Sequence, residues 1–223
     1  MIRMFFGVPG CGKTTSAVRE ILKHKFPVPF WFKLLYYITF PFIKLFNKNY
    51  GSLNEIYTYY FGVSTVNYYS NFPNSCSKLV SLDGLGNWTF RPNSYITIDE
   101  SALEYNSRQF KSLPMHTIEW FKLHRHHLEK GDPKNCSIIN FWSQSWNDTD
   151  KIIRDLCDEV WLVKKLGPFT VLRRIFKKIE IDEHTHQIID GYKFEKLLVS
   201  LFMKIFGFSS IKIYLRKPYY KYF

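Results

Sequence analysis

Near its start the sequence contains a glycine-rich segment, preceded by a short apolar run and followed by residues with helical spacing. The segment reads Gly7-Val8-Pro9-Gly10-Cys11-Gly12-Lys13-Thr14 and matches the pattern G-x-x-x-x-G-K-[ST] at every fixed position. Between a strand and a helix, such a loop binds phosphate, because its backbone N–H groups converge on the anion. Its glycines let the chain curl around the ligand, which a Cβ atom would obstruct. The segment therefore predicts a site for ATP, formed by residues 7–14 and Thr15.

The predicted catalytic residues come from this loop and from a second motif further along the chain. Residues 95–98 are a short apolar run that ends in Asp99 and Glu100, and open α/β sheets place ligands at the carboxyl ends of such strands. We expect Lys13 to neutralise phosphate charge, while Thr14 and Asp99 hold Mg²⁺. Glu100 would polarise the attacking water, which favours hydrolysis over transfer to a second substrate. Adjacent acids also occur in ordinary turns, but beside a complete phosphate loop we favour catalysis.

Three further polar side chains are candidates for catalysis. Residues 137–142 form another apolar run, and Gln144 after it either senses the γ-phosphate or is a surface amide. Arg125, within the basic cluster of residues 124–127, and Arg154 are candidates for contacting a phosphate, in their own or a neighbouring subunit. A solvated helix face is the alternative for both arginines. The cluster and His116 lack the spacing of known histidine or cysteine metal sites, so we expect no metal there.

The order of apolar segments predicts an α/β fold. Strands are expected at residues 2–6, 64–70, 95–98, 137–142 and 159–163, and helices at 14–25, 117–129 and 149–157, with Asp148 as the cap of the last helix. Strands that alternate with helices predict a mostly parallel sheet covered on both faces. We expect an ATPase domain at residues 1–165. Residues 166–223 would form an extension, in which alternating apolar and basic residues at 169–181 predict a β-ribbon before an aromatic, basic tail.

Composition limits the cellular setting and the partners. Lys and Arg number 31 against 19 for Asp and Glu, a formal charge of +12, which favours an anionic partner such as nucleic acid or an acidic membrane face. The four cysteines are far apart in the sequence and predict reduced thiols in a cytosol. The first apolar run leads directly into the glycine loop and leaves no room for a cleavable signal peptide. We therefore expect the ATPase domain in the cytoplasm.

An aromatic insert occupies residues 26–50. Between positions 28 and 43 the only charged residue is Lys33, yet this run is short for a bilayer span, which needs about 20 residues. One crossing would also separate Lys13 from Asp99, although both must reach one nucleotide. Lysines flank both ends, so we favour a hairpin in the inner leaflet, with burial against the protein or a neighbouring subunit as the alternative. Residues 197–208 are a second, poorer apolar stretch.

Together these motifs resemble the zonula occludens toxin (Zot) family. Its members are the assembly ATPases of filamentous bacteriophages and are related to the HerA/FtsK class of P-loop DNA pumps. The resemblance covers roughly residues 1–165. It rests on the glycine loop, the strand before Asp99 and Glu100, the helix that carries Arg125, the strand that ends at Gln144, and the segment that ends at Arg154.

The resemblance implies an additional-strand P-loop fold, in which the strand ending at Gln144 lies between the other two catalytic strands. It also implies a homo-oligomer that hydrolyses ATP with Mg²⁺ and drives virion assembly and extrusion. Its expected partners are phage coat proteins, single-stranded DNA and the cytoplasmic face of the host inner membrane. The alternatives are a soluble P-loop nucleotide kinase, and an ATP-dependent switch or DNA-binding protein without a role in export.

Overall fold

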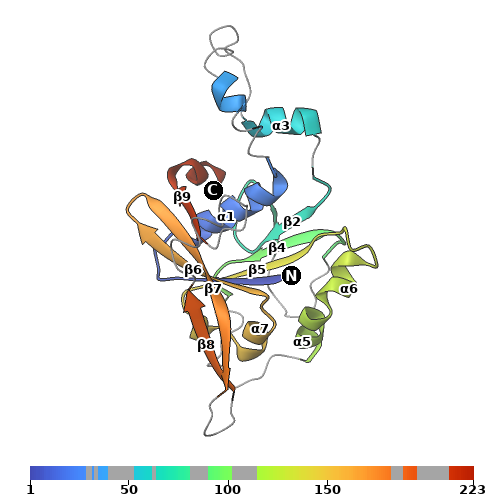
Figure 1. Ribbon diagram of the computed structural model, residues 1–223. Helices are drawn as coiled ribbons and strands as arrows, with labels where there is room; N and C mark the ends of the chain where they lie inside the picture. The colour runs from blue at the N-terminus through green and yellow to red at the C-terminus, as the bar shows by residue number, and fades with distance from the viewer. Residues whose placement is uncertain are drawn as a thin grey trace.

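Figure 1 shows the computed structural model, which describes residues 1–28, 32, 35–39, 53–61, 64–80, 90–101, 115–181, 188–194 and 211–223. The described strands form one mixed sheet in the order β3-β2-β4-β5-β1-β6-β7-β8, with β9 also paired to β7. In that order they are β3 Lys78–Leu79, β2 Asn67–Ser70, β4 Ser94–Ile98, β5 Ser137–Ser143, β1 Ile2–Phe6, β6 Glu159–Leu166, β7 Phe169–Ile181, β8 Ile188–Phe194 and β9 Ile211–Leu215. Pairing is parallel from β3 to β6 and antiparallel from β6 onward. The mostly parallel α/β sheet predicted from the sequence is confirmed.

The position of β5 defines the class of this fold. β5 pairs in parallel with β1 on one side and with β4 on the other. The strand that leads to the glycine loop is thus separated from the strand that leads to Asp99 by one additional strand. The additional-strand arrangement implied by the family resemblance is therefore confirmed.

Helices cover both faces of the sheet. The described helices are α1 Lys13–Lys25, α3 Leu53–Phe61, α5 Met115–Lys122, α6 His124–Glu129 and α7 Lys151–Asp155, with short 3₁₀ helices η1 Trp146–Asp148 and η2 Lys217–Tyr222. Figure 1 shows α1 and the C-terminal turn on one side of the sheet, and α5, α6 and α7 on the other. Successive side chains of β1 point to opposite faces of the sheet. Met4 packs with Phe121 and Ile153 on one face, whereas Phe5 packs with Ala17 of α1 on the other.

Three aromatic rings form the centre of the α1 face. The ring of Phe5 stacks on Trp142 of β5 at a centroid distance of 4.0 Å and lies 6.2 Å from Trp161 of β6. All three side chains are at most 3% exposed. Burial of each such ring stabilises a fold by roughly 3 kcal/mol or more. This stack therefore fixes the three strands that support the glycine loop.

The prediction of one continuous helix at 117–129 is wrong. The structure has α5 and α6 instead, interrupted at Leu123. His124 turns inward at the break: its Nδ1 lies 2.7 Å from the Phe121 carbonyl oxygen and its Nε2 lies 3.2 Å from the amino group of Met1. Burial lowers the pKa of His124, so the neutral ring donates to the carbonyl and accepts from the terminal amine. A tertiary contact to the chain terminus thus accompanies the break.

The predicted cap of the next helix is also wrong. Asp148 belongs to the 3₁₀ helix η1, and Asp150 caps α7 by accepting a hydrogen bond from the Ile152 N–H at 2.8 Å. The reason is the backbone conformation. Thr149 is extended and Asp150 is not helical, so the helix begins only after them. A helix is present within the predicted range 149–157, but it is shorter, from Lys151 to Asp155.

The C-terminal residues return to α1. Expected only as an aromatic tail, they form β9 and η2, and β9 pairs with β7 opposite Phe169 to Arg173. Lys212 of β9 forms an ion pair with Glu20 of α1 at 2.8 Å, and Arg19 contacts the same carboxylate at 2.6 Å. The expected boundary at 165/166 falls where β6 and β7 pair within one sheet.

The aromatic insert is described in part. Residues 35–39 are helical and α3 closes the insert before β2. Among the described residues, no helix has both the length and the apolar character needed to cross a bilayer. Residues 29–31, 33–34 and 40–50 of the insert, and the apolar stretch 197–208, lie outside the described residues.

The Glu20–Lys212 ion pair leads to a prediction about stability. Burial alone would raise the pKa of the Glu20 carboxyl, but Lys212 and Arg19 lower it below its ordinary value of 4.5. Changing Lys212→Ala leaves the buried carboxylate with Arg19 alone, and we expect unfolding in urea at neutral pH to become easier by about 2 kcal/mol. Lys217→Ala, which removes an exposed lysine of η2, is the control and should change stability little.

The same pair predicts the direction of pH dependence. A carboxyl whose folded pKa is lowered stabilises the fold above its unfolded pKa, and this contribution is lost as pH falls through the folded value. The stability difference between wild type and Lys212→Ala should therefore shrink below about pH 4.5. A difference that stays constant down to pH 3 would mean that the ion pair does not stabilise the fold.

Candidate nucleotide site

The phosphate loop lies at the carboxyl end of β1. Gly10 and Gly12 have φ of 73° and 94°, in the left-handed region that favours glycine. A Cβ atom on Gly7 would overlap the Val163 carbonyl oxygen, and one on Gly12 would lie 2.7 Å from the Thr170 hydroxyl. The loop is therefore held against β6 and β7 so closely that both positions need glycine.

Lys13 is held across the loop. Its side chain is buried, and Nζ donates to the carbonyl oxygens of Gly7 at 2.9 Å and Val8 at 3.4 Å. The ammonium group of a lysine only donates hydrogen bonds. These two bonds hold its positive charge at the mouth of the loop. Neighbouring hydroxyls close the loop below it, where Thr15 and Ser16 both donate to the Gly12 carbonyl oxygen. The arrangement suits an anion bound over the start of α1.

The predicted metal ligands meet at this mouth. The Thr14 hydroxyl donates to Oδ2 of Asp99 at 2.7 Å, across the gap between α1 and the end of β4. Burial raises the pKa of Asp99, while the bonds from Thr14 and from the Glu100 N–H act in the opposite direction. A hydroxyl and a carboxylate are hard oxygen donors, which Mg²⁺ prefers. The residues present therefore fit Mg²⁺ bound between α1 and β4.

Asn71 positions Asp99 and was not found by sequence reasoning. It follows β2, the strand next to β4, and its side chain bonds the Asp99 backbone twice. Oδ1 accepts from the Asp99 N–H at 2.7 Å, and Nδ2 donates to the Asp99 carbonyl oxygen at 2.8 Å. Nothing in the residues around Asn71 marks it as special, since only the pairing of β2 with β4 brings it to Asp99.

Glu100 and Gln144 also come together. Nε2 of Gln144 donates to Oε2 of Glu100 at 3.1 Å, because their strands β4 and β5 are neighbours that end at the same edge of the sheet. Glu100 has φ of 49°, a left-handed conformation that costs a non-glycine residue of the order of 1 kcal/mol. The turn directs this carboxylate to the site, and the catalytic roles of both residues stay predictions.

The two candidate arginines lie on two helices that cover the same side of the sheet, Arg125 on α6 and Arg154 on α7. Arg125 is on α6, next to His124, which contacts the amino terminus that begins β1. The phosphate loop follows the other end of β1, so Arg125 does not reach the phosphates of its own subunit. Arg154 lies on the α7 face, 5.7 Å from the Trp146 ring, with Nη1 3.4 Å from Oδ1 of Asn147. Action on a neighbouring subunit stays a prediction for both.

Strands β7 and β9 support the phosphate loop from its other side. The Thr170 hydroxyl donates to the Cys11 carbonyl oxygen at 3.2 Å, and the Tyr214 hydroxyl contacts Ser16 and lies 3.5 Å from the Gly12 carbonyl oxygen. The side chain of Arg216 also lies close to the loop, because a Cβ on Gly12 would be 2.9 Å from the Cδ atom of Arg216. Sequence reasoning missed these residues, because it predicted only a ribbon at 169–181 and an aromatic, basic tail after it.

The cysteine and histidine side chains do not form a metal site in the described part of the chain. No group of three His, Cys, Asp or Glu residues there is arranged to hold a metal ion. Cys11, Cys76 and Cys136 are buried free thiols. Burial raises the pKa of Cys11, despite the nearby charge of Lys13, so this loop residue stays a neutral thiol at neutral pH.

Comparison with known proteins identifies the fold. No protein-family model matches the sequence, and no curated protein matches it. Among solved structures, the N-terminal domain of zonular occludens toxin from Neisseria meningitidis aligns with a TM-score of 0.50 and 14% identity, over 89% of this chain and 95% of that one. The chain shares the fold of that toxin domain. The genome packaging NTPase B204 from Sulfolobus turreted icosahedral virus 2, in complex with ATP-gammaS, aligns with a TM-score of 0.38 and 10% identity, over 87% of this chain and 98% of that one.

The double contact between Asn71 and Asp99 predicts an effect on turnover. Asn71→Ala frees the backbone of Asp99, and misplacing a metal ligand by about 1 Å costs roughly 100-fold in rate. We expect ATP hydrolysis to fall by roughly 10- to 100-fold and to need more Mg²⁺ for half-maximal rate. Asn135→Ala is the control, because it removes a similar side-chain bond to the Glu129 carbonyl oxygen. An unchanged Mg²⁺ titration would refute a positioning role for Asn71.

Proposed function

We propose that this protein is a Mg²⁺-dependent ATPase that hydrolyses ATP to ADP and phosphate. The observation that carries the proposal is the convergence of the phosphate loop with Asp99 and the Glu100–Gln144 pair at one edge of the sheet. Thr14 and Asp99 would hold Mg²⁺, which supplies charge neutralisation between the phosphates when bound. Lys13 would bind the β- and γ-phosphates from the loop side.

In this proposal Glu100 acts as the base for water. A carboxylate beside the metal ligand accepts the proton of the attacking water, and Gln144 holds it in place through their 3.1 Å hydrogen bond. A kinase would need room for an acceptor substrate here, where Glu100 and Gln144 instead contact each other. This contact favours the ATPase over the alternative of a soluble nucleotide kinase.

We further propose that the ATPase drives assembly and extrusion of a filamentous virion at a membrane. The likeness to the toxin domain supports the fold of such a motor, and the excess of 31 basic over 19 acidic residues supports an anionic partner such as single-stranded DNA. The basic surface and the aromatic insert together support a site on the cytoplasmic face of the host inner membrane. Phage coat proteins would be the cargo with the DNA, and a homo-oligomer would be the working form.

Two substitutions separate binding of ATP from its hydrolysis. Lys13→Ala removes the cation of the phosphate loop, and we expect it to abolish ATP binding or turnover. Glu100→Gln keeps size and hydrogen bonding but removes the base, so ATP should still bind while hydrolysis slows by roughly 100-fold or more. Binding is measured with a fluorescent ATP analogue and hydrolysis by phosphate release. A Glu100→Gln protein that hydrolyses ATP at the wild-type rate would exclude Glu100 as the base.

Mixing experiments test the two arginines across subunits. If Arg154 or Arg125 contacts the nucleotide of a neighbour, its Ala variant should be inactive alone and should regain activity when mixed with Lys13→Ala, because mixed oligomers contain intact pairs. Steady-state hydrolysis is measured over a range of mixing ratios. Arg91→Ala mixed with Lys13→Ala is the control. Absence of rescue at every ratio would count against action in trans.

A further inference from the structure

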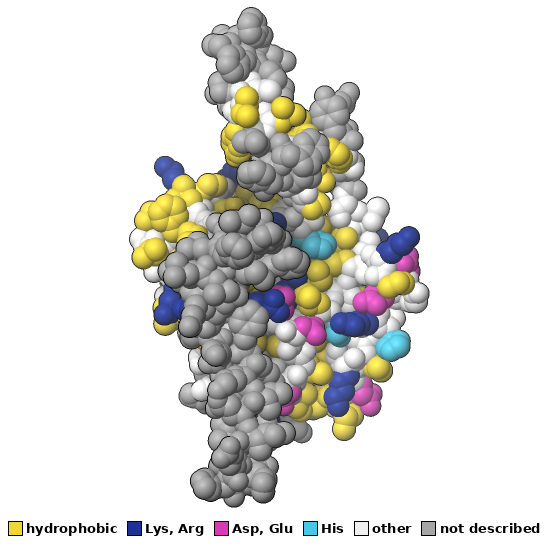
Figure 2. Space-filling model, viewed as in Figure 1, with side chains coloured by type: hydrophobic (Ala, Val, Ile, Leu, Met, Phe, Trp, Pro, Cys, Tyr) yellow, Lys and Arg dark blue, Asp and Glu magenta, His cyan; other side chains and the backbone are white. Residues whose placement is uncertain are grey.

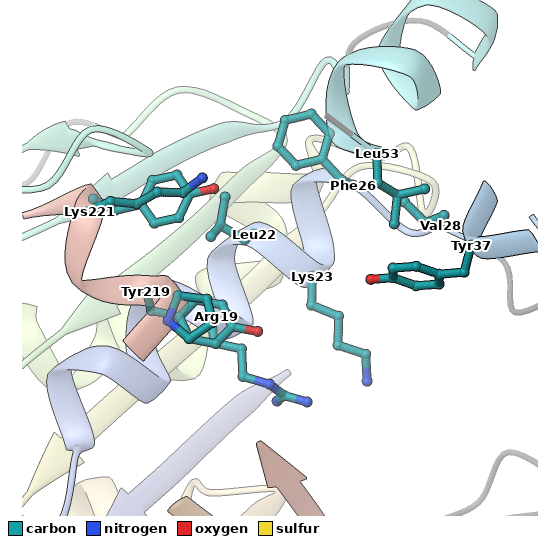
Figure 3. Close-up of a pocket in the computed structure, with 11 residues that line it drawn as sticks. Arg19, Leu22, Lys23, Phe26, Val28, Tyr37, Leu53, Tyr219 and Lys221 are labelled. Carbon is teal, nitrogen blue, oxygen red and sulfur yellow. The ribbon is translucent and has the colours of Figure 1, made fainter. Parts of the chain in front are cut away.

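A cavity lies on the far end of α1 from the phosphate loop. Figure 3 shows it between the exposed face of α1, the C-terminal helix η2 and the base of the aromatic insert. Its volume is about 350 Å³, and its described lining residues are Arg19, Leu22, Lys23, Phe26, Val28, Tyr37, Leu53, Pro218, Tyr219, Lys221 and Tyr222. No residue of the proposed ATPase chemistry lines it, so it is separate from the nucleotide site.

The charge of this cavity is positive. Arg19, Lys23 and Lys221 contribute basic side chains, and its described lining contains no acid. The nearest carboxylate in sequence, that of Glu20, is buried and already paired with Arg19 and Lys212. Residues 21–54 and 211–223 contain no Asp or Glu at all. The cavity therefore suits an anion.

The remaining lining is apolar or aromatic. Leu22 belongs to α1 and Phe26 caps the end of that helix, and the rings of Tyr37 and Tyr219 carry hydroxyl groups at their tips. In Figure 3 the hydroxyl end of Tyr37 points toward the side chain of Lys23. Basic side chains beside tyrosines and aliphatic residues recur where proteins meet the headgroup region of a bilayer. A phosphate with an attached apolar group matches this combination.

Exposed apolar side chains continue from the cavity onto the insert. Leu35 and Ile38 of the insert are 54% and 57% exposed, and Phe61 of α3, which follows the insert, is 53% exposed. Figure 2 shows hydrophobic side chains over this part of the molecule, at the top of the view. Such clustered exposure is costly in water and marks a surface that another apolar phase covers. A nucleic acid strand would neutralise the lysines but would leave these aliphatic groups in water, whereas a bilayer accounts for both.

We propose that the cavity binds the phosphate headgroup of an anionic phospholipid, while the described apolar residues of the insert enter the adjacent interface of the bilayer. Lys23 would contact the phosphate from α1 and Lys221 from η2, while Arg19 stays in its ion pair with Glu20. Because α1 begins at the phosphate loop, this places the lipid at one end of the helix whose other end binds ATP. The inference goes beyond the proposed ATPase and does not depend on hydrolysis.

The test is binding of the full-length protein to vesicles. Wild type is mixed with vesicles of phosphatidylcholine alone or of phosphatidylcholine with phosphatidylglycerol, and the bound fraction is measured by flotation. The double variant Lys23→Ala/Lys221→Ala removes two cavity cations, and we expect affinity for the phosphatidylglycerol vesicles to fall by roughly 30-fold. The matched control Lys122→Ala/Lys134→Ala removes two exposed lysines elsewhere and should bind within about twofold of wild type.

A second pair of substitutions tests the apolar part of the surface. Leu35→Ser/Ile38→Ser should weaken binding to both kinds of vesicle, because it removes area that enters the interface and leaves the charge unchanged. Basal ATP hydrolysis without vesicles should be unchanged in all three double variants, which also shows that they fold. A protein that binds vesicles but not ATP would refute the proposed ATPase and leave the lipid site standing.

Three outcomes would overturn the inference. One is wild-type affinity of Lys23→Ala/Lys221→Ala for phosphatidylglycerol vesicles. Another is an equal loss in the control pair, which would assign the effect to overall charge rather than to the cavity. The third is that a single-stranded oligonucleotide binds wild type without competing with vesicles, and that its affinity falls only in the variant Lys23→Ala/Lys221→Ala. That result would make the cavity a nucleic acid site.

Discussion

Parallel pairing of β5 with both β1 and β4 is the constraint on which the site depends. Parallel strands end at the same edge of a sheet, so this pairing brings the phosphate loop, Asp99 and Gln144 together although up to 137 positions separate them in the sequence. The stacked rings of Phe5, Trp142 and Trp161 hold these central strands in place under α1. Loss of this pairing would therefore remove the site and a large part of the core together.

The geometry at that edge is supported from both sides. On one side Asn71 fixes the backbone of Asp99, and the left-handed turn at Glu100 directs its carboxylate toward Gln144. On the other side β7 and β9 close against the loop, with Thr170 and Tyr214 bonded to its carbonyl groups. A phosphate loop must keep its N–H groups directed at the ligand. The contacts from Thr170 and Tyr214 involve carbonyl groups of the loop and therefore do not occupy those N–H groups. The C-terminal residues thus belong to the nucleotide site as part of its wall.

Helix α1 connects this site with the basic cavity. Its first turn carries Lys13 and Thr14, and the same helix presents Arg19 and Lys23 to the cavity beside η2 and the insert. The ion pair between Glu20 and Lys212 joins the helix to β9 in between. A membrane-bound motor of the proposed kind would have its nucleotide and its lipid contact on one rigid element, with the C-terminal strand packed along it.

The sequence by itself determined the parts of this protein whose chemistry is local. The glycine loop needs particular residues because the backbone itself binds phosphate, and the strand before Asp99 and Glu100 is recognisable from a few adjacent positions. The main strands and their alternation with helices followed from periodicity in the same way. Only the tertiary structure decided what depends on distant contacts: Asn71 at Asp99, Thr170 and Tyr214 at the loop, the break at His124, and the place of Arg125 beside the start of β1, away from the loop. These residues have no local signature, because each acquires its role from a neighbour that folding brings to it.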